Sequence, residues 1–370
     1  MPDIGLIEAF MRLTSIHRPS RGEGAFAEAA AAAFAEAGIA LADDGSAGAV
    51  GGEAGNLYGL VKGTAGAPPI MLVAHMDTVA PGKGIRPREE GGYIVSSGDT
   101  VLGADDCAGV VAILGGVGDS IRSGGPGGDV HILLTVAEEI GLMGAKAYRH
   151  RGVPPEFCFV LDGGGPIGDV FVKAPYQATL DVTITGVAAH AGIEPEKGVN
   201  AVSVAAEAVS GMRLGRIDPE TTANIGTIKG EGAANIVCGQ VSMECEARSA
   251  VKAKLDGQVA HMEGRFRDAA ARAGASAEIK TCMEYEGFEV GAEDPIIRLL
   301  EKAFGRMGLA ARLKATGGGS DTNVFNASGM RSVNLGLGME KVHTVGERIR
   351  RDDIAKASEM VRRIVEAAAD

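Results

Sequence analysis

The first 160 residues alternate between two hydrophobic patterns. Continuous apolar runs of strand length are separated by segments in which apolar residues recur every three or four positions, as in helices. Strands that alternate with helices predict a largely parallel sheet that is covered on both faces. The predicted helices are residues 4–13, 24–36 (with Ser20 as a cap), 106–122 and 143–151, and the predicted strands are residues 56–62, 70–74, 130–136 and 157–161.

The pattern changes near residue 172. Residues 178–186 alternate between Thr or Asp and larger apolar side chains, which is typical of a half-exposed strand. The order that follows is helix, strand, strand, helix, strand, so the segment predicts the split βαβ arrangement of a ferredoxin-like domain. These later elements are predicted at residues 199–212, 223–229, 236–248, 252–273 and 277–284.

From residue 294 the helix and strand pattern of the first part resumes, with a helix to residue 307, a strand at 332–335 and a C-terminal helix. We therefore predict an α/β catalytic domain, formed by residues 1–173 and 284–370, with a mostly parallel sheet flanked by helices. An inserted ferredoxin-like α+β domain, residues 174–283, interrupts it. The length of 370 residues fits two domains better than one.

Composition narrows the class of protein. Hydrophobic content of 45% with 23% charged residues is typical of a soluble globular protein. A formal net charge of -12 argues against binding to nucleic acid or to acidic membranes. The absence of tryptophan and the aromatic content of 4% leave little material for stacking on bases.

The N-terminal sequence lacks a basic region followed by an apolar core, so no secretory signal is predicted. No apolar run approaches the roughly 20 residues that a membrane-spanning helix needs. The five cysteines are odd in number and lack zinc-ribbon spacing. We expect them to be reduced thiols in a cytoplasmic protein.

Four short polar motifs stand where apolar runs stop or where a helix is predicted to begin. They contain His75 and Asp77, Asp105 and Asp106, Glu138 and Glu139, and Asp162, and a fifth motif near the C-terminus contains His343. Strand ends in an open α/β sheet are where ligands bind. Zinc in proteins is bound by His, Asp and Glu as well as by Cys. The motifs therefore predict the ligand set of a two-metal hydrolase.

The donor types suggest an assignment. His75 and His343 would supply one imidazole to each zinc ion, and Asp105 would bridge the two ions. Glu139 would complete the set on the His343 side and Asp162 the set on the His75 side. Each motif alone also occurs as a structural histidine, as compensation of a helix dipole or as a turn, but their coincidence at successive strand ends favours a metal site.

Two further carboxylates have expected roles. Asp77, two residues after His75, can accept the other ring N–H and fix the tautomer of that histidine. The adjacent Glu138 and Glu139 must differ in role, since one can bind metal while the other accepts a proton from water. Spacing alone does not decide which of the two is the base.

At these residues the chain resembles the dizinc exopeptidases and deacylases, the family of peptidase T, carboxypeptidase G, succinyl-diaminopimelate desuccinylase and aminoacylase. The peptidase T-like branch fits best, through Asp162-Gly163-Gly164 and the loop from Gly317 to Asp321. The matching stretches begin with AHMDTVAPG at residue 74, GADDCAG at 103, TVAEEIGLMGA at 135, LDGG at 161, GVAAHAGIEPEKGVNA at 186, GGGSDTNVFNASG at 317 and VHTVGE at 342.

The resemblance implies a zinc site with a cis peptide after the bridging residue. It implies that Asp77 orients a ligand and that Glu138 is the general base. The zinc ligands that it implies are His75, Asp105 as the bridge, Glu139, Asp162 and His343.

The inserted domain resembles the lid and dimerisation domain of this family. By that resemblance His190 would stabilise the oxyanion. Asn235 and Arg248 would meet the substrate, together with Gly318 and Gly319. A surface position on a strand is an equally good explanation for Arg248.

The sequence thus predicts a cytoplasmic, zinc-dependent aminopeptidase of the peptidase T type that acts on short peptides as a homodimer. Two zinc ions per subunit are expected, although cobalt or manganese would suit the same residues. The alternatives are a carboxypeptidase or N-acyl amino acid deacylase with the same metals, and a metal-free binding protein on the same fold. Cys107 stands where many relatives have Lys, and we expect it to be inert core.

Overall fold

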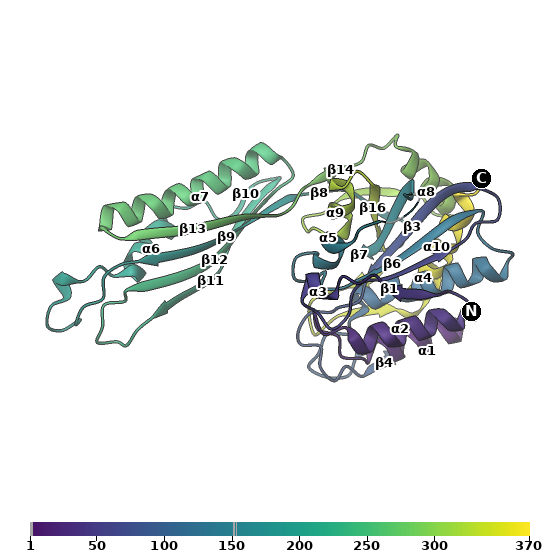
Figure 1. Cartoon of the computed structure of the whole chain (residues 1–370), viewed down its shortest axis with the longest axis horizontal. Helices are drawn as coiled ribbons and strands as arrows, with labels where there is room; N and C mark the ends of the chain where they lie inside the picture. The colour runs from purple at the N-terminus through teal and green to yellow at the C-terminus, as the bar shows by residue number, and fades with distance from the viewer. Residues whose placement is uncertain (1–2, 151, 153) are drawn as a thin grey trace. The chain divides into compact units, whose positions relative to one another are not determined.

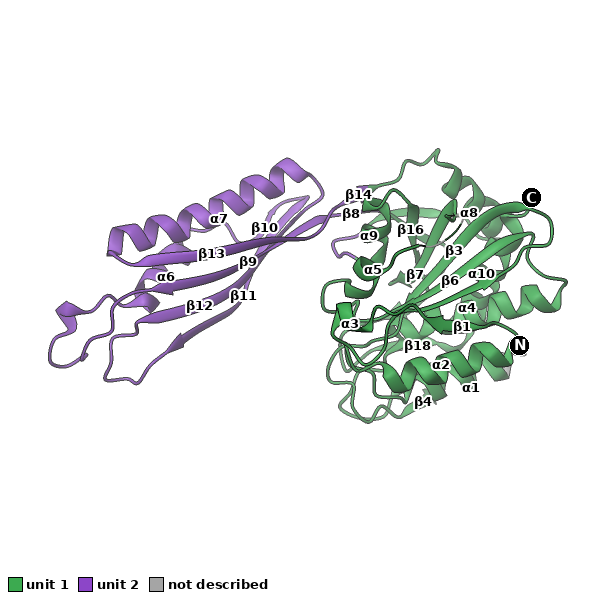
Figure 2. Ribbon diagram, viewed as in Figure 1, with its two compact units in different colours: residues 1–172, 289–315, 320–370 green, residues 173–288, 316–319 purple. Residues whose placement is uncertain are grey.

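The structure, a computed structural model, describes residues 3–150, 152 and 154–370. Its contacts divide the chain into two compact units, whose elements are labelled in Figure 1 and coloured by unit in Figure 2. Unit 1 is the chain up to Val172 with Glu289–Ala315 and Ser320–Asp370, and unit 2 is Lys173–Phe288 with Thr316–Gly319. Residues 284–288 and 316–319, expected in the catalytic domain, lie in unit 2.

The described residues of unit 1 form a nine-stranded mixed sheet in the order β1-β2-β6-β3-β7-β16-β8-β14, with β15 paired to β8. The central strands β6, β3, β7 and β16 are parallel, as predicted. Towards the edges, β1, β2 and β8 pair antiparallel with their neighbours. The strands are β1 (Leu41–Asp43), β2 (Leu57–Val61), β3 (Ala67–His75), β6 (Gly128–Thr135), β7 (Phe157–Gly163), β8 (Asp169–Ala174), β14 (Phe288–Glu289), β15 (Arg312–Ala315) and β16 (Arg331–Gly336).

The central strands send alternate side chains to two different cores. In β3, Ile70, Leu72 and Ala74 belong to the larger core, whereas Met71 and Val73 belong to a smaller core on the opposite face. Strands β6 and β7 alternate in the same way. Burial on both faces explains why these strands have continuous apolar runs instead of alternating sequences.

Helices cover both faces of this sheet. The larger core includes residues from α1, α2, α3, α4, α8 and α10, and the smaller core includes residues from α5 and α9. None of the helices among the described residues is long and apolar enough to span a membrane. The helices are α1 (Asp3–Thr14), α2 (Gly24–Glu36), α3 (Ala47–Val50), α4 (Ala104–Arg122), α5 (Met143–Ala147), α8 (Pro295–Gly305), α9 (Asp321–Ala327) and α10 (Arg351–Ala367).

Helix α5 is shorter than the helix predicted at residues 143–151, of which residue 151 lies outside the described part of the chain. It ends at Ala147 because Tyr148 has an extended backbone, with φ -59° and ψ 135°. The Tyr148 ring packs among aromatic neighbours instead, with ring centroids 6.3 Å from Tyr58, 6.2 Å from His150 and 6.4 Å from Phe325.

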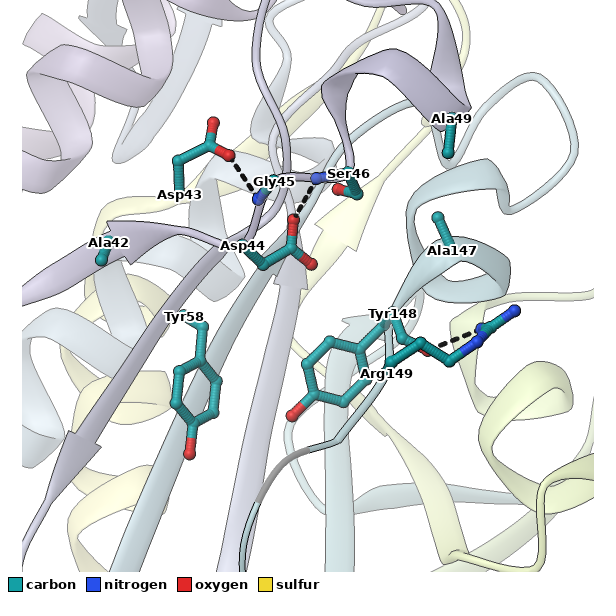
Figure 3. A pocket seen from close by; sticks show the side chains of 10 residues that line it. All are labelled: Ala42, Asp43, Asp44, Gly45, Ser46, Ala49, Tyr58, Ala147, Tyr148 and Arg149. Atoms are coloured by element: carbon teal, nitrogen blue, oxygen red, sulfur yellow. Dashed lines mark hydrogen bonds between the residues drawn. The ribbon is translucent and has the colours of Figure 1, made fainter.

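A pocket of about 360 Å³ lies beside α3 and α5, and Tyr58, Tyr148, Asp44 and Arg149 are among its lining residues (Figure 3). Its charged groups bind to nearby protein atoms: Asp44 accepts the Ser46 N–H over 2.9 Å, and Arg149 donates to two neighbouring carbonyl groups. The predicted site residues are not part of this lining, and we assign it no ligand.

A small antiparallel sheet in unit 1 has the order β17-β18-β5-β4. The loop between β17 (Met339–Glu340) and β18 (Arg348–Arg350) carries His343, and the pairing of these two strands holds the ends of the loop together. Strand β18 also pairs with β5 (Tyr93–Ser96), which pairs with β4 (Pro87–Glu90).

Unit 2 is a five-stranded antiparallel sheet in the order β10-β11-β12-β9-β13 with two helices. The predicted β-α-β-β-α-β order is present with one additional strand, β10. Strand β12 begins at Gln240 and not near Ile236, because the preceding residues pair with another loop: Ile236 bridges His190. The elements are β9 (Tyr176–Thr185), η1 (Pro195–Lys197), α6 (Ala201–Ser210), β10 (Gly215–Asp218), β11 (Thr221–Glu231), β12 (Gln240–Ser249), α7 (Lys252–Ala273) and β13 (Ser276–Tyr285).

Candidate metal centre

The predicted metal ligands of unit 1 lie near one edge of its sheet. His75 is the last residue of β3 and pairs in register with Thr135, the last residue of β6. Glu139 follows β6 closely, and Asp162 is the penultimate residue of β7. Since these strands are parallel, their carboxyl ends meet at the edge where open α/β sheets bind ligands.

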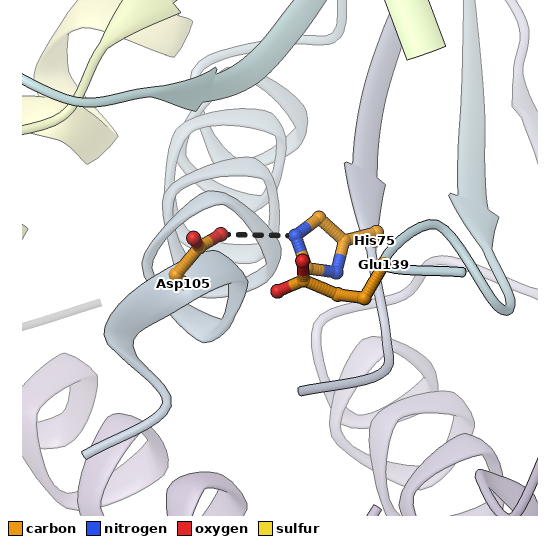
Figure 4. A group of neighbouring side chains, drawn as sticks. All are labelled: His75, Asp105 and Glu139. Atoms are coloured by element: carbon orange, nitrogen blue, oxygen red, sulfur yellow. Dashed lines mark hydrogen bonds and ion pairs between the residues drawn. The ribbon is translucent and has the colours of Figure 1, made fainter. Parts of the chain in front are cut away.

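His75 faces two carboxylates with one ring nitrogen. Its Nε2 lies 2.9 Å from Asp105 Oδ1 and 3.8 Å from Asp162 Oδ1. Figure 4 shows His75 and Asp105 facing each other, with the carboxylate of Glu139 beside them. The structure therefore brings these residues together in a buried place, where His75 is only 2% exposed.

Asp105 also faces the second histidine. Its Oδ2 lies 3.1 Å from His343 Nε2, and the same nitrogen lies 3.1 Å from Glu139 Oε1. Each oxygen of Asp105 is thus directed at a different imidazole. A carboxylate that bridges two metal ions would need this placement.

Asp106 differs from its neighbour Asp105, to which it is joined by a cis peptide, as the resemblance implied. Its Oδ2 accepts the N–H of His75 and its Oδ1 accepts the N–H of Gly109, both over 3.0 Å. Asp106 therefore fixes the backbone of a ligand strand and the start of α4. This arrangement supports Asp105 as the bridge, although an oxygen of Asp106 also lies within 4.8 Å of ligand atoms of His75 and Asp162.

The site concentrates carboxylates that are hidden from water. Burial raises the pKa values of Glu138 and Asp162 well above their usual range. Burial acts on Asp105 in the same direction, but hydrogen bonds with His343 and His75 outweigh it and hold the pKa of Asp105 below its usual range. A buried set of acids that repel one another is stabilised by bound cations.

The donor set fits metal ions. Ligand atoms of His75, Asp105 and Glu139 lie within 4.8 Å of one another. Glu139 Oε1 is a buried atom, and His343 Nε2 lies 3.1 Å from it. Hydrogen bonds to Asp105 and Glu139 raise the pKa of His343 to about 10, which reflects its strongly negative surroundings. Imidazole and carboxylate groups are ligands of zinc.

Asp77 contacts the candidate ligand His75 and the turn that carries Glu138 and Glu139. Its Oδ1 lies 3.4 Å from His75 Nδ1 and accepts the N–H of Glu138 over 3.0 Å. Its Oδ2 accepts the N–H of Glu139 over 3.2 Å and the hydroxyl of Ser20 over 2.6 Å. Asp77 therefore connects the His75 strand to the turn of both glutamates.

The expectation that Ser20 caps α2 was wrong, because Glu23 occupies the N-cap position and Ser20 donates to Asp77. Asp321 lies in the matching stretch that begins at residue 317, and the sequence predicts no role for it. It is 2% exposed, accepts the Thr135 hydroxyl over 2.6 Å, and burial raises its pKa to about 6. A carboxylate two residues after a run of three glycines was the available signal.

Glu138 is buried, with 8% of its surface exposed, and stands next to the candidate ligand Glu139. The Glu138 carbonyl accepts the N–H of Leu142 over 2.8 Å, so a tight turn holds both glutamates. Burial raises the pKa of Glu138, and a carboxylate of raised pKa beside the candidate ligands suits a proton acceptor, because it binds a proton more readily than an exposed carboxylate does.

The remaining predicted residues lie in unit 2 and form two groups. In the first, the N–H of Ala191 donates to the Asn235 carbonyl over 2.9 Å, and His190 bridges Ile236. His190 and Asn235 are therefore on neighbouring loops, and both residues are exposed.

Arg248 forms the second group with the glycine loop. Its Nη1 lies 3.4 Å from both the Tyr285 hydroxyl and the Gly317 carbonyl, and its Nη2 donates to Glu246 over 3.0 Å. A side chain at Gly319 would overlap the Tyr285 ring, with the first carbon only 2.2 Å from a ring atom. The Gly318 N–H donates to the Thr316 hydroxyl over 3.2 Å.

Comparisons with known proteins give the family of the chain. Residues 56–199 match the family described as Peptidase family M28, and residues 176–274 match the Peptidase dimerisation domain. The aminopeptidase PepT of Bacillus cereus ATCC 10987 is 37% identical over all of both chains, with a TM-score of 0.88. A Staphylococcus aureus subsp. aureus mu50 tripeptidase is 34% identical over all of this chain and 99% of its own, with a TM-score of 0.92.

The chain belongs to the peptidase T-like metallopeptidases. It is therefore a hydrolase of the peptidase class and has the α/β fold with a dimerisation domain. The protein YqjE of Bacillus subtilis (strain 168) is also similar, with 39% identity over 98% of each chain. Peptidases with these domains depend on metal, and His75, Asp105, Glu139 and Asp162 fall inside the matched M28 region.

Proposed function

We propose that this peptidase T-like enzyme is a dizinc aminopeptidase that removes the N-terminal residue from short peptides, tripeptides in particular. The observation that carries the proposal is the position of Asp105 between His75 and His343, next to the buried Glu138. The similar proteins described as an aminopeptidase and a tripeptidase support this substrate class.

His75 and Asp162 would hold one metal ion, His343 and Glu139 the other, and Asp105 both. Zinc ions bound there would act as Lewis acids toward the scissile carbonyl and would lower the pKa of a water molecule. Cobalt and manganese can use the same nitrogen and oxygen donors.

Glu138 would accept a proton from the attacking water and later pass it to the leaving amine. Its raised pKa favours the protonated form that lies between these two transfers. Asp77 would keep the His75 ring in the orientation that directs Nε2 at Asp105, and its bonds to the 138–139 turn would fix the base.

The roles of the unit 2 residues follow from resemblance. His190 would stabilise the negative oxygen of the tetrahedral intermediate. Asn235, Arg248, Gly318 and Gly319 would contact the substrate. The Arg248 guanidinium already binds Glu246, so a substrate carboxylate would have to compete with that carboxylate.

The decisive test is hydrolysis of a free tripeptide beside its N-acetylated form, with and without chelator, measuring the amino acids released. Release of the N-terminal residue from the free peptide only, abolished by chelator and restored by zinc, is the expected result. Cleavage of the blocked peptide instead would identify a deacylase or carboxypeptidase with the same metal site. Full activity after complete metal removal would contradict the dizinc proposal.

A homodimer formed through unit 2 is part of the proposal, supported by the match to a peptidase dimerisation domain over residues 176–274. We place the enzyme in the cytoplasm, where its five free cysteines would stay reduced. Light scattering after size exclusion should give about twice the chain mass of 37.7 kDa. A mass of one chain at micromolar concentration would refute the dimer.

A further inference from the structure

A buried carboxylate outside the proposed ligand set holds the backbone of the bridging residue. Glu347 is 2% exposed, and each of its oxygens accepts a backbone hydrogen bond. The Gly103 N–H donates to Oε2 over 2.7 Å, and the Asp105 N–H donates to Oε1 over 3.0 Å. Both oxygens of Glu347 are therefore engaged by the segment that carries Asp105.

Glu347 itself stands on the loop that carries His343. Its N–H donates to the Thr344 carbonyl over 3.0 Å, which closes a turn beside the histidine. His343 has a φ of 62°, in the left-handed region that residues other than glycine seldom adopt. The orientation of His343 thus depends on what anchors this loop, and the Glu347 carboxylate anchors it to the Asp105 segment.

Arg18 holds the same segment at a second point. Its side chain is fully buried, lies 4.7 Å from the centre of the Phe26 ring, and donates from Nη2 to the Gly103 carbonyl over 2.6 Å. Gly103 has a φ of 69°, and a side chain there would come within 2.7 Å of Arg18 Nη2. Glu347 therefore fixes the N–H of Gly103, and Arg18 fixes its carbonyl.

We propose that Glu347 is a positioning residue that sets the placement of His343 against Asp105 and so determines the metal affinity of the His343 side. This inference rests on the proposed dizinc function. His343 Nε2 and Asp105 Oδ2 lie 3.1 Å apart. Glu347 connects the two residues, because its carboxylate accepts the Asp105 N–H and its backbone is part of the loop that carries His343. His75 and Asp162 stand on strands β3 and β7, so their own placement does not depend on this loop. Asp105 is common to both sides, and its Oδ1 keeps the contact with His75 Nε2 over 2.9 Å that does not involve the loop.

The test is a cobalt(II) titration of chelator-stripped protein, followed by visible absorption and by the bound metal per chain. The wild type is expected to bind two equivalents. In Glu347→Gln and Glu347→Ala the first equivalent should bind as in the wild type. The second should bind roughly 10–100-fold more weakly, the usual effect of removing a group that orients a metal ligand.

Glu340→Gln is the matched control. Glu340 is a glutamate of the adjacent strand β17 whose carboxylate binds Arg348 and Tyr93, away from Gly103 and Asp105. This variant should titrate as the wild type does. Glu347→Gln keeps the size of the side chain, so it provides the test if Glu347→Ala fails to fold.

The outcomes separate this inference from the proposed function. A wild type that binds fewer than two equivalents overturns the dizinc function and the inference with it. Two equivalents in the wild type with an unchanged second affinity in Glu347→Gln overturns the positioning role alone. Equal weakening of both equivalents, or the same loss in Glu340→Gln, also overturns it, because a general loosening of the fold would then be responsible.

Discussion

The two sides of the candidate metal centre differ in their exposure to solvent. The His75 side, formed by His75 and Asp162, has side chains that are 2% and 12% exposed. On the His343 side, Glu139 is 8% exposed but His343 is 51% exposed. Asp105, at 10%, belongs to both sides.

This difference follows from the elements that carry the residues. His75 and Asp162 are parts of central strands between two cores, whereas His343 stands on a loop between two short strands. Regular strands place side chains precisely, but they leave little room for a substrate. The more open His343 side is therefore the side on which we expect substrate to approach, and the His75 side is the one that we expect to keep its metal.

The largest effect should come from removing each histidine in turn. His75→Ala should lose both metal ions and activity, because Asp105 loses its buried partner. His343→Ala should keep one ion and still lose more than about a thousandfold in turnover, since an active-site metal supplies several kcal/mol. Metal content and kcat measured on both variants check this, and one retained ion in His75→Ala would reverse the order of the two sides.

Glu138→Gln should keep metal binding on both sides of the centre and still lose most of the catalytic activity. We expect both metal ions to bind as in the wild type and kcat to fall by roughly 10²–10⁴-fold, the usual contribution of a general base. Metal analysis together with kcat and KM is the measurement. Turnover within about threefold of the wild type would rule out Glu138 as the base, and loss of metal would make it a ligand.

The two sides of the metal centre should release their metal ions to a chelator at different rates. A chelator should remove the ion of the exposed His343 side first and the ion of the His75 side at least about tenfold more slowly, because the surroundings of a metal site control the access of solvent. Stopped-flow capture of released zinc by a coloured chelator measures both phases. A single phase with two equivalents would show that exposure does not separate the sides.

The smallest expected effect is a loss of folding stability at acid pH, in addition to the protonation of the candidate metal ligands. Burial first, and then the nearby His150, lowers the pKa of His131 from 6.5 to about 4. Between these pH values the unfolded chain binds more protons than the folded chain, so the contribution of neutral His131 to the free energy of unfolding rises with pH. This contribution is complete above about pH 6.5 and is lost as the pH falls towards 4.

His131→Gln should remove this part of the pH dependence of unfolding in urea on metal-free protein. Tyr58→Phe is the control, because it removes the hydroxyl that contacts His131 Nδ1 over 2.8 Å but keeps the buried ring. The slope between pH 4 and 6.5 should persist in Tyr58→Phe. An unchanged slope in His131→Gln would assign the acid sensitivity to the carboxylates of the metal centre.

The sequence was most informative where burial and chemistry coincide. The apolar runs of β3, β6 and β7 could be predicted because both faces of these strands are buried, and the polar residues behind them mark the edge of the sheet. His75, Glu139 and Asp162 could be gathered into one site for this reason, whereas Asp105 and His343 were added from their donor types and from the resemblance to the family. Their roles as ligands remain predictions.

Contacts made by single side chains across the chain could not be predicted. Ser20 precedes α2 and has the right chemistry for a cap, but it binds Asp77, 57 residues away. Glu347 is the last residue of the matching stretch VHTVGE, but no role could be predicted for it, and Arg18 gave no signal at all. Charged residues are ordinarily exposed, and no spacing rule connects either of them to Gly103. In unit 2, β10 was missed because a strand of four residues carries too little pattern.

The order of β7, β16 and β8 in the sheet has a consequence for the synthesis of the chain. Strand β16 lies between β7 and β8, although it follows them by more than 150 residues, and His343 comes later still. At roughly 5–20 residues per second a ribosome needs about 10–30 s to reach β16 after completing β7. During that interval one edge of β7 is open, and the Asp105 carboxylate lacks its contact with His343.

We therefore expect a nascent chain to remain without peptidase activity until nearly all of it has been made. Ribosome-bound chains stalled before residue 331 should take up at most one zinc ion, and hydrolysis by such chains would contradict this order.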